Sequence, residues 1–167
     1  MAITTEMVRA LRERSGAGIM DCKHALEQSN GNMEKAEQIL RDKGIASAEK
    51  KASRVTNQGV VESYIHSGGR IGAMVELNCE TDFVSRTPEF KALAHNLAMQ
   101  VAAMKPKYVD RSDMPAGSEE NPEQVCLLQQ PFIREPGKNI HDLVTELTAK
   151  IGENIRVKRF SRFELGE

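Results

Sequence analysis

Residues 1–44 carry hydrophobic side chains at helical spacing in three short segments. Each set falls on one helix face: Met7, Val8 and Leu11; Ile19, Cys22, Ala25 and Leu26; Ala36, Ile39 and Leu40. Thr4 and Asn32 can cap the first and third of these helices, and the closely spaced Gly16 and Gly18 break the chain after the first. Gly44 is expected to end the third helix. The pattern predicts a small three-helix module over residues 1–44.

The next stretch, ASAEKKASRVTN (residues 46–57), has no sustained apolar stripe. Small, charged and polar residues of this kind predict a linker over residues 45–57, helical at most in part. Its Lys50, Lys51 and Arg54 are interpreted as a solvated face, with a binding patch as the less favoured alternative.

The apolar period changes to two after the linker. GVVESYIH (residues 59–66) and IGAMVELN (residues 71–78) alternate and are separated by SGGR, which predicts a β-hairpin. The segment NCETDFV (residues 78–84) continues directly from the second strand and turns abruptly polar. We therefore expect a loop tip there, with the aromatic Phe83 beside Asp82.

A helix start follows the tip, since Thr87 can cap a helix whose first residue is Pro88. Another helix is expected between Asn139 and Gly152. The inward faces of these two helices are Phe90, Leu93, Ala94, Leu97 and Val101, and Ile140, Leu143, Val144, Leu147 and Ile151. Between them, residues 105–130 are rich in Pro, Gly and charge, which predicts an exposed connection with at most a short helical turn near Glu123.

The tail IRVKRFSRFE (residues 155–164) predicts a last strand. Its apolar phase slips between Val157 and Phe160, which indicates a bulge or a change of face. Residues 58–167 are therefore expected to form a core in which helices cover an antiparallel sheet, giving an α+β fold.

Composition narrows the classes of partner. The chain has 167 residues, 40% of them hydrophobic and 28% charged, which suits a globular protein with one sizeable core. Its formal net charge of −1 argues against nucleic acid as a direct partner. No apolar run approaches the ~20 residues that span a bilayer, and the first residues resemble neither a signal nor a transit peptide. We expect a cytoplasmic protein without membrane contact.

Candidate chemistry is sparse. The three cysteines, Cys22, Cys79 and Cys126, are widely spaced, and the histidines lie in unrelated segments, so neither a disulfide framework nor a metal site is supported. No phosphate loop, zinc-protease motif or nucleophile elbow occurs. A thiol enzyme using Cys79 is the alternative, but we expect no cofactor, no catalytic residue and a protein that works by binding.

Two stretches in this order closely resemble the signatures of the elongation factor Ts family: LRERSGAGIMDCKHAL (residues 11–26) and ELNCETDFV (residues 76–84). The resemblance extends through QPFIREP (residues 130–136) and the ending RVKRFSRFELGE (residues 156–167), so it covers nearly the whole chain. It implies a ubiquitin-associated-like N-terminal domain, followed by the family's core domain. It also implies guanine nucleotide exchange on elongation factor Tu in translation, without covalent chemistry.

The resemblance also implies two partner-binding surfaces. Thr81, Asp82, Phe83 and Val84 match the tip that enters elongation factor Tu near its nucleotide site, where Phe83 would wedge between side chains and disturb the magnesium and phosphate contacts of GDP. In the alternative, Phe83 folds back onto its own core and Asp82 caps the turn. On the N-terminal domain the matching positions are Leu11, Arg12, Ile19 and Met20. The alternative there is that Ile19 and Met20 are partly buried at the helix start.

Longer members of the family carry two related core subdomains, whereas this chain has room for one, so it resembles a short form. A second copy of the chain could then cover the sheet, giving a homodimer. The seam is expected among apolar residues of the hairpin and the last strand: Val61, Ile65, Ala73, Val75, Phe160 and Phe163. In the alternative, residues 105–130 fold over this face and the chain is a monomer. The alternative function is a ubiquitin-associated-type adaptor without exchange activity.

Overall fold

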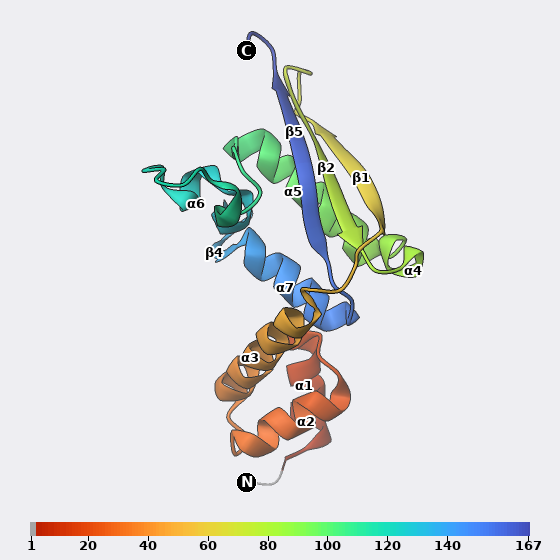
Figure 1. Ribbon diagram of the computed structural model, residues 1–167. Coiled ribbons are helices and arrows are strands. Elements are labelled where there is room, and N and C mark those ends of the chain that lie inside the picture. The colour runs from red at the N-terminus through yellow and green to blue at the C-terminus, as the bar shows by residue number, and fades with distance from the viewer. Residues whose placement is uncertain (1–2) are drawn as a thin grey trace.

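The computed structural model describes residues 3–167, which form an α+β protein. A module of three helices precedes a three-stranded antiparallel sheet with helices on one of its faces, as predicted (Figure 1). The elements in chain order are α1 Thr5–Ser15, α2 Ile19–Gln28, α3 Met33–Lys51, β1 Gln58–Ile65, β2 Ile71–Cys79, α4 Asp82–Ser85, α5 Pro88–Met104, η1 Arg111–Asp113, α6 Pro122–Val125, η2 Leu127–Gln129, β3 Pro131–Phe132, β4 Glu135–Asn139, α7 Ile140–Ile151 and β5 Arg156–Glu164.

The helical module has its own small core and the predicted caps. Thr4 Oγ1 accepts from the N–H of Met7 at 3.2 Å, and Asn32 Oδ1 accepts from the N–H of Lys35 at 2.9 Å. Gly16 ends α1 in the left-handed conformation. The buried residues are Leu11, Cys22, Ala25, Leu26 and Ala36.

The third helix is longer than predicted. Gly44 lies inside α3, which runs on to Lys51, so most of the expected linker is helical. A Cβ added at Gly44 would lie 3.2 Å from the Cβ of Ala149 in α7. Glycine at position 44 therefore permits close packing of α3 on α7, and it does not act as a helix stop. The division into domains at residues 44 and 57 stays a prediction.

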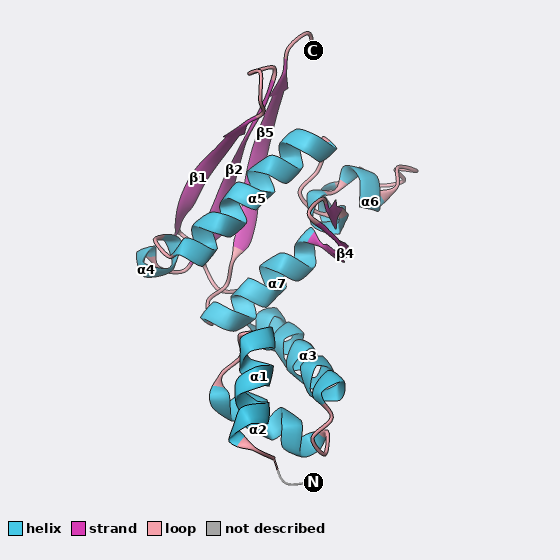
Figure 2. Cartoon of the chain, turned by 180° about the vertical axis from the view of Figure 1, so that it is seen from behind, coloured by secondary structure: helices cyan, strands magenta, loops and turns pink. Residues whose placement is uncertain are grey.

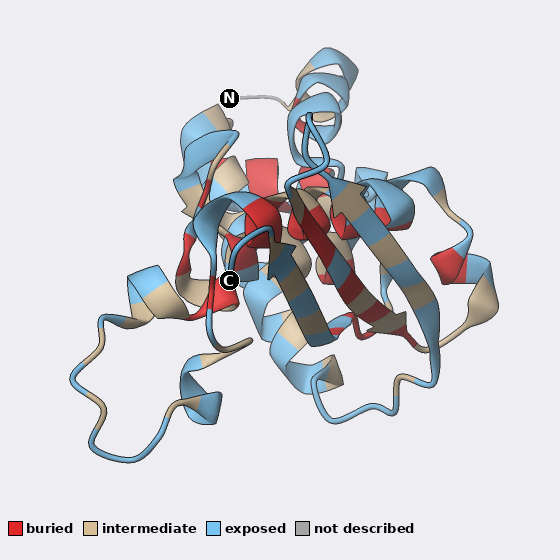
Figure 3. Ribbon diagram, turned by 90° about the horizontal axis from the view of Figure 1, so that it is seen from above, coloured by how far each residue is buried: buried red, intermediate tan, exposed pale blue. Residues whose placement is uncertain are grey.

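The sheet has the strand order β1-β2-β5, with both pairs antiparallel. Side chains of β2 alternate between a buried inner face and an outer face, and β2 is the most buried of the three strands (Figure 3). The register between β2 and β5 shifts at Glu76 and Leu77, where Lys158 has no partner. The predicted bulge between Val157 and Phe160 is confirmed.

Helix α5 packs on one face of the sheet and lies in front of the strands in Figure 2, and α7 packs against α5 and α3. Thr87 caps α5 as predicted, accepting from the N–H of Phe90 at 3.3 Å, and Asn139 caps α7. The predicted apolar stripe of α5 is buried, and that of α7 packs against the same core. Helix α5 covers one face of the sheet, and α7 packs against α5 on that same side.

The segment between α5 and α7 is more ordered than the sequence indicates. It contains two 3₁₀ turns, the single-turn helix α6 and the β3–β4 hairpin, which was not predicted. Two buried glutamines hold it: Gln100 Nε2 donates to Gln130 Oε1 at 3.2 Å, and Gln130 Nε2 donates to the carbonyl of Gln124 at 2.8 Å. The segment lies beside α5 and α7, so it leaves the outer face of the sheet uncovered (Figures 1 and 2). Across residues 3–167, no helix combines the length and apolar character that a membrane crossing requires.

Candidate functional site

The expected loop tip is a single helical turn that presents a phenylalanine to solvent. In α4, Phe83 is 79% exposed, whereas the following Val84 is 8% exposed and belongs to the main core. The alternative in which Phe83 folds back onto the core is therefore wrong for this conformation. The buried position of Val84 also corrects the expectation that it faces a partner, because its side chain fixes the turn from below.

The turn is closed by its own hydrogen bonds. Ser85 Oγ donates to the carbonyl of Asp82 at 2.9 Å, and Thr87 Oγ1 donates to the carbonyl of Val84 at 2.8 Å. Carbonyls that would otherwise need water or a partner are thus satisfied within the turn. Phe83 is consequently displayed on an ordered support.

Two further residues of the predicted tip have different surroundings. Asp82 is paired with Arg86 one turn later, where Nη2 donates to Oδ2 at 2.8 Å, and both side chains reach solvent. Such an exposed pair contributes little to stability, so the carboxylate can exchange partners. Thr81 precedes the helix, and its hydroxyl donates to Glu153 Oε1 at 2.6 Å. No sequence signal identified Glu153, because it lies 72 positions further along the chain.

The four positions predicted on the helical module divide into two groups. Leu11 is completely buried in the module's core, so it supports the surface from within and does not face a partner. Arg12 is exposed, and Ile19 and Met20 are 56% and 59% exposed at the start of α2. Both side chains are thus partly buried, as the alternative had it, yet each leaves more than half of its surface in solvent. Adjacent apolar side chains with this much exposure are typical of a contact surface.

The start of α2 and the α4 turn lie toward the same side of the molecule, at the right in Figure 1. Between them, α3 packs on α7, and α7 leads into β5 beside the base of α4. The two apolar surfaces are therefore carried by one continuous framework.

The Cys79 thiol does not have the character of a nucleophile. It is fully buried, its Sγ donates to the carbonyl of Thr81 at 3.1 Å, and burial followed by the charge of Glu153 raises its pKa to about 11. A reactive cysteine needs a lowered pKa and access to solvent. Cys22 and Cys126 are also buried and unpaired. The thiol-enzyme alternative loses its support.

Comparisons with known proteins agree on one family. The sequence model of the family described as Elongation factor TS matches residues 21–125. The chain is 53% identical to Elongation factor Ts of Carboxydothermus hydrogenoformans, over 99% of this chain and 90% of the relative. It is 50% identical to Elongation factor Ts of Thermotoga maritima, over 100% of this chain and 98% of the relative. It is 49% identical to Elongation factor Ts of Heliobacterium modesticaldum, over 99% of this chain and 91% of the relative.

Proposed function

The chain belongs to the elongation factor Ts family of translation elongation factors, and from that premise we propose that it binds elongation factor Tu carrying GDP and promotes release of the nucleotide. The observation that carries this proposal is the 79% exposure of Phe83 on a hydrogen-bonded turn. A rigid aromatic side chain is suited to enter a gap in a partner, because it loses little conformational freedom on binding.

Exchange of this kind needs differential affinity and no covalent step. GDP is held in such a partner by magnesium and by contacts around its phosphates. A side chain that displaces the partner's magnesium-positioning element weakens the binding of both the metal and the nucleotide. In this mechanism Phe83 supplies the apolar bulk, and the Asp82 carboxylate supplies acceptors for polar groups that are displaced. Linkage then requires that the factor bind the nucleotide-free partner more tightly than the GDP-bound partner.

The helical module would supply a second contact, on the GTP-binding domain of elongation factor Tu. Its exposed side chains at the start of α2, Ile19 and Met20, provide the apolar area, and the exposed Arg12 of α1 provides a charge. We assign affinity to this surface and nucleotide release to the α4 tip. Both partners would meet in the cytoplasm, without nucleic acid or membrane in the contact.

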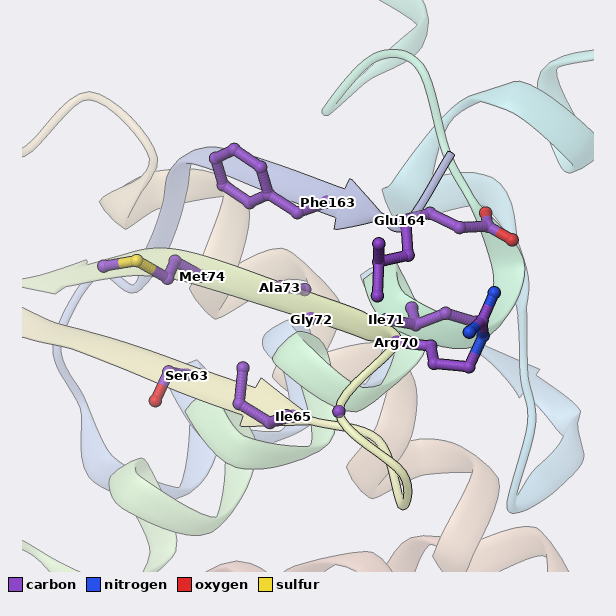
Figure 4. A pocket seen from close by; sticks show the side chains of 11 residues that line it. Ser63, Ile65, Arg70, Ile71, Gly72, Ala73, Met74, Phe163 and Glu164 are labelled. Carbon is purple, nitrogen blue, oxygen red and sulfur yellow. The ribbon is translucent and has the colours of Figure 1, made fainter. Parts of the chain in front are cut away.

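We further propose that the outer face of the sheet binds a second copy of the chain. Four large apolar side chains are exposed there on three strands: Val61, Ile65, Met74 and Phe163. Ile65, Met74 and Phe163 line a hollow at the hairpin end of the sheet (Figure 4). Self-association buries such a face by pairing like with like around a two-fold axis. Ala73, Val75 and Phe160, which the sequence placed at this seam, face the helices instead.

Release of a fluorescent GDP analogue from purified elongation factor Tu tests the proposed function. We expect the chain to accelerate release in a concentration-dependent manner, with excess unlabelled GDP present as trap. A chain that binds elongation factor Tu without accelerating release would be an adaptor of the alternative kind. A chain that does neither would remove the proposed function altogether.

A further inference from the structure

The base of the α4 turn is held by Glu153, which lies 72 positions further along the chain. Thr81 is the N-cap of α4, yet its side chain makes no capping hydrogen bond to the helix. Its hydroxyl donates to Glu153 Oε1 at 2.6 Å and its backbone N–H donates to Glu153 Oε2 at 3.0 Å. One carboxylate therefore takes both donors of Thr81, and it fixes the backbone from which α4 departs.

The residue after Glu153, Asn154, is hydrogen-bonded to the backbone that follows helix α3. Asn154 is 6% exposed, and its Nδ2 donates to the carbonyls of Ala52 at 3.3 Å and Arg54 at 2.8 Å. Its own N–H donates to Glu80 Oε1 at 2.7 Å, an oxygen that also accepts from Arg54 at 3.4 Å. The backbone that follows α3 and the residue that precedes Thr81 thus meet at Asn154.

From these contacts we infer that Glu153 and Asn154 are positioning residues for nucleotide exchange. Glu153 sets the direction in which α4 carries Phe83, and Asn154 sets the helical module relative to that tip. The inference rests on the proposed function, because it concerns how two partner-binding surfaces reach their partner together. The packing of Gly44 against Ala149 adds a second, apolar constraint on the same alignment.

The physical basis is preorganisation. If α4 were free to pivot at Thr81, Phe83 would have to be ordered during binding, and the ordering would oppose insertion. If the module were free to move about residues 52–57, the contact at Met20 would help Phe83 less. Once Met20 is bound, the effective concentration of Phe83 at its own site on the partner would be lower. Glu153 removes the first freedom, and Asn154 removes the second.

Glu153 offers a substitution series that separates hydrogen bonding from other effects. In Glu153→Gln, the amide oxygen can accept from the Thr81 N–H while the amide nitrogen donates to the Thr81 hydroxyl, so both contacts can persist. Glu153→Ala removes both. Thr81→Val removes the hydroxyl that donates to Glu153 Oε1 and keeps the backbone N–H that donates to Glu153 Oε2. Glu146→Ala is the matched control, because Glu146 is an exposed glutamate of α7 that pairs with Lys138 away from the tip.

We expect the maximal rate of GDP release, measured at saturating factor, to fall about tenfold in Glu153→Ala, by a smaller factor in Thr81→Val, and little in Glu153→Gln or Glu146→Ala. Hydrogen exchange of the free factor gives a readout independent of the partner. Protection of amides 81–86 should drop in Glu153→Ala while protection of β2 stays unchanged. Wild-type kinetics in Glu153→Ala, or an equal loss in Glu153→Gln, would overturn the role of Glu153, as would general loss of protection in β2.

Asn154 is tested by a double-mutant cycle. The quantity compared is the efficiency of GDP release, the maximal rate divided by the half-saturating concentration of factor. In the parent chain we expect Met20→Ala and Phe83→Ala to show coupled effects on this efficiency, and in an Asn154→Ala background we expect their effects to add. Persistent coupling in that background would contradict the alignment role. If the unmodified chain does not accelerate GDP release at all, the proposed function fails, and the exchange protection of amides 81–86 still decides whether Glu153 holds the tip.

Discussion

Replacing Phe83 by alanine tests whether the α4 tip serves the fold or a partner. Because Phe83 is 79% exposed, about a fifth of its side chain is buried by folding. Full burial of a phenylalanine is worth up to about 3 kcal/mol, so the substitution should cost the fold roughly 0.5 kcal/mol. In a chain of this size such a loss lowers the melting temperature by about 2 °C.

The expected effect on exchange is much larger. An aromatic side chain that is buried at the centre of an interface contributes about 2 kcal/mol, which corresponds to a roughly 30-fold loss in the efficiency of catalysed GDP release. The measurement is the release of fluorescent GDP over a range of factor concentrations, beside a thermal melt of the free chain. Met104→Ala is the control, because Met104 is an exposed apolar residue at the opposite end of α5.

Two results would refute this reasoning. Unchanged exchange in Phe83→Ala would show that the ring is no wedge. A fall in melting temperature well beyond that of Met104→Ala would show that Phe83 belongs to the core in solution, contrary to its exposure in the structure.

Three further predictions concern the remaining surfaces. Met20→Ala should raise the half-saturating concentration of factor about fivefold while leaving the maximal release rate unchanged, with Ile45→Ala as the exposed control; a loss in maximal rate would contradict the division of roles. Phe163→Asp should halve the mass measured by light scattering at micromolar concentration, and a parent chain that is already monomeric would exclude the dimer. At pH 8 the native thiols should react slowly with a disulfide reagent, because a pKa of about 11 leaves Cys79 about one part in a thousand as thiolate, and rapid modification would contradict its burial.

Periodicity and caps were enough to predict the main elements. The apolar residues of α5 recur at helical spacing, and the same residues are buried in the core. Phe90 and its neighbours could therefore be predicted without a structure. The bulge in β5 was visible because a phase slip in an exposed-and-buried alternation has few other causes. The exposure of Phe83 could not be settled by pattern alone, and the family resemblance favoured it.

Other features depend on contacts between distant segments. Gly44 has the local signature of a helix stop, but its role is set by Ala149 on another helix. The β3–β4 hairpin depends on the buried pair Gln100 and Gln130, whose partners are backbone groups that no sequence pattern marks. Glu153 resembles any surface glutamate until the fold brings Thr81 to it.

Reciprocity between factor and nucleotide explains why a small, rigid tip suits the proposed mechanism. If the bound factor lowers the affinity of the partner for GDP by a given ratio, bound GDP must lower the affinity of the partner for the factor by the same ratio. A large surface at the nucleotide site would bind so tightly that an incoming nucleotide could not displace it. With one exposed ring on a turn anchored by Val84 and Glu153, only a few atoms of the factor oppose nucleotide binding. The remaining affinity can then come from Ile19 and Met20, whose contact with the partner need not oppose nucleotide binding.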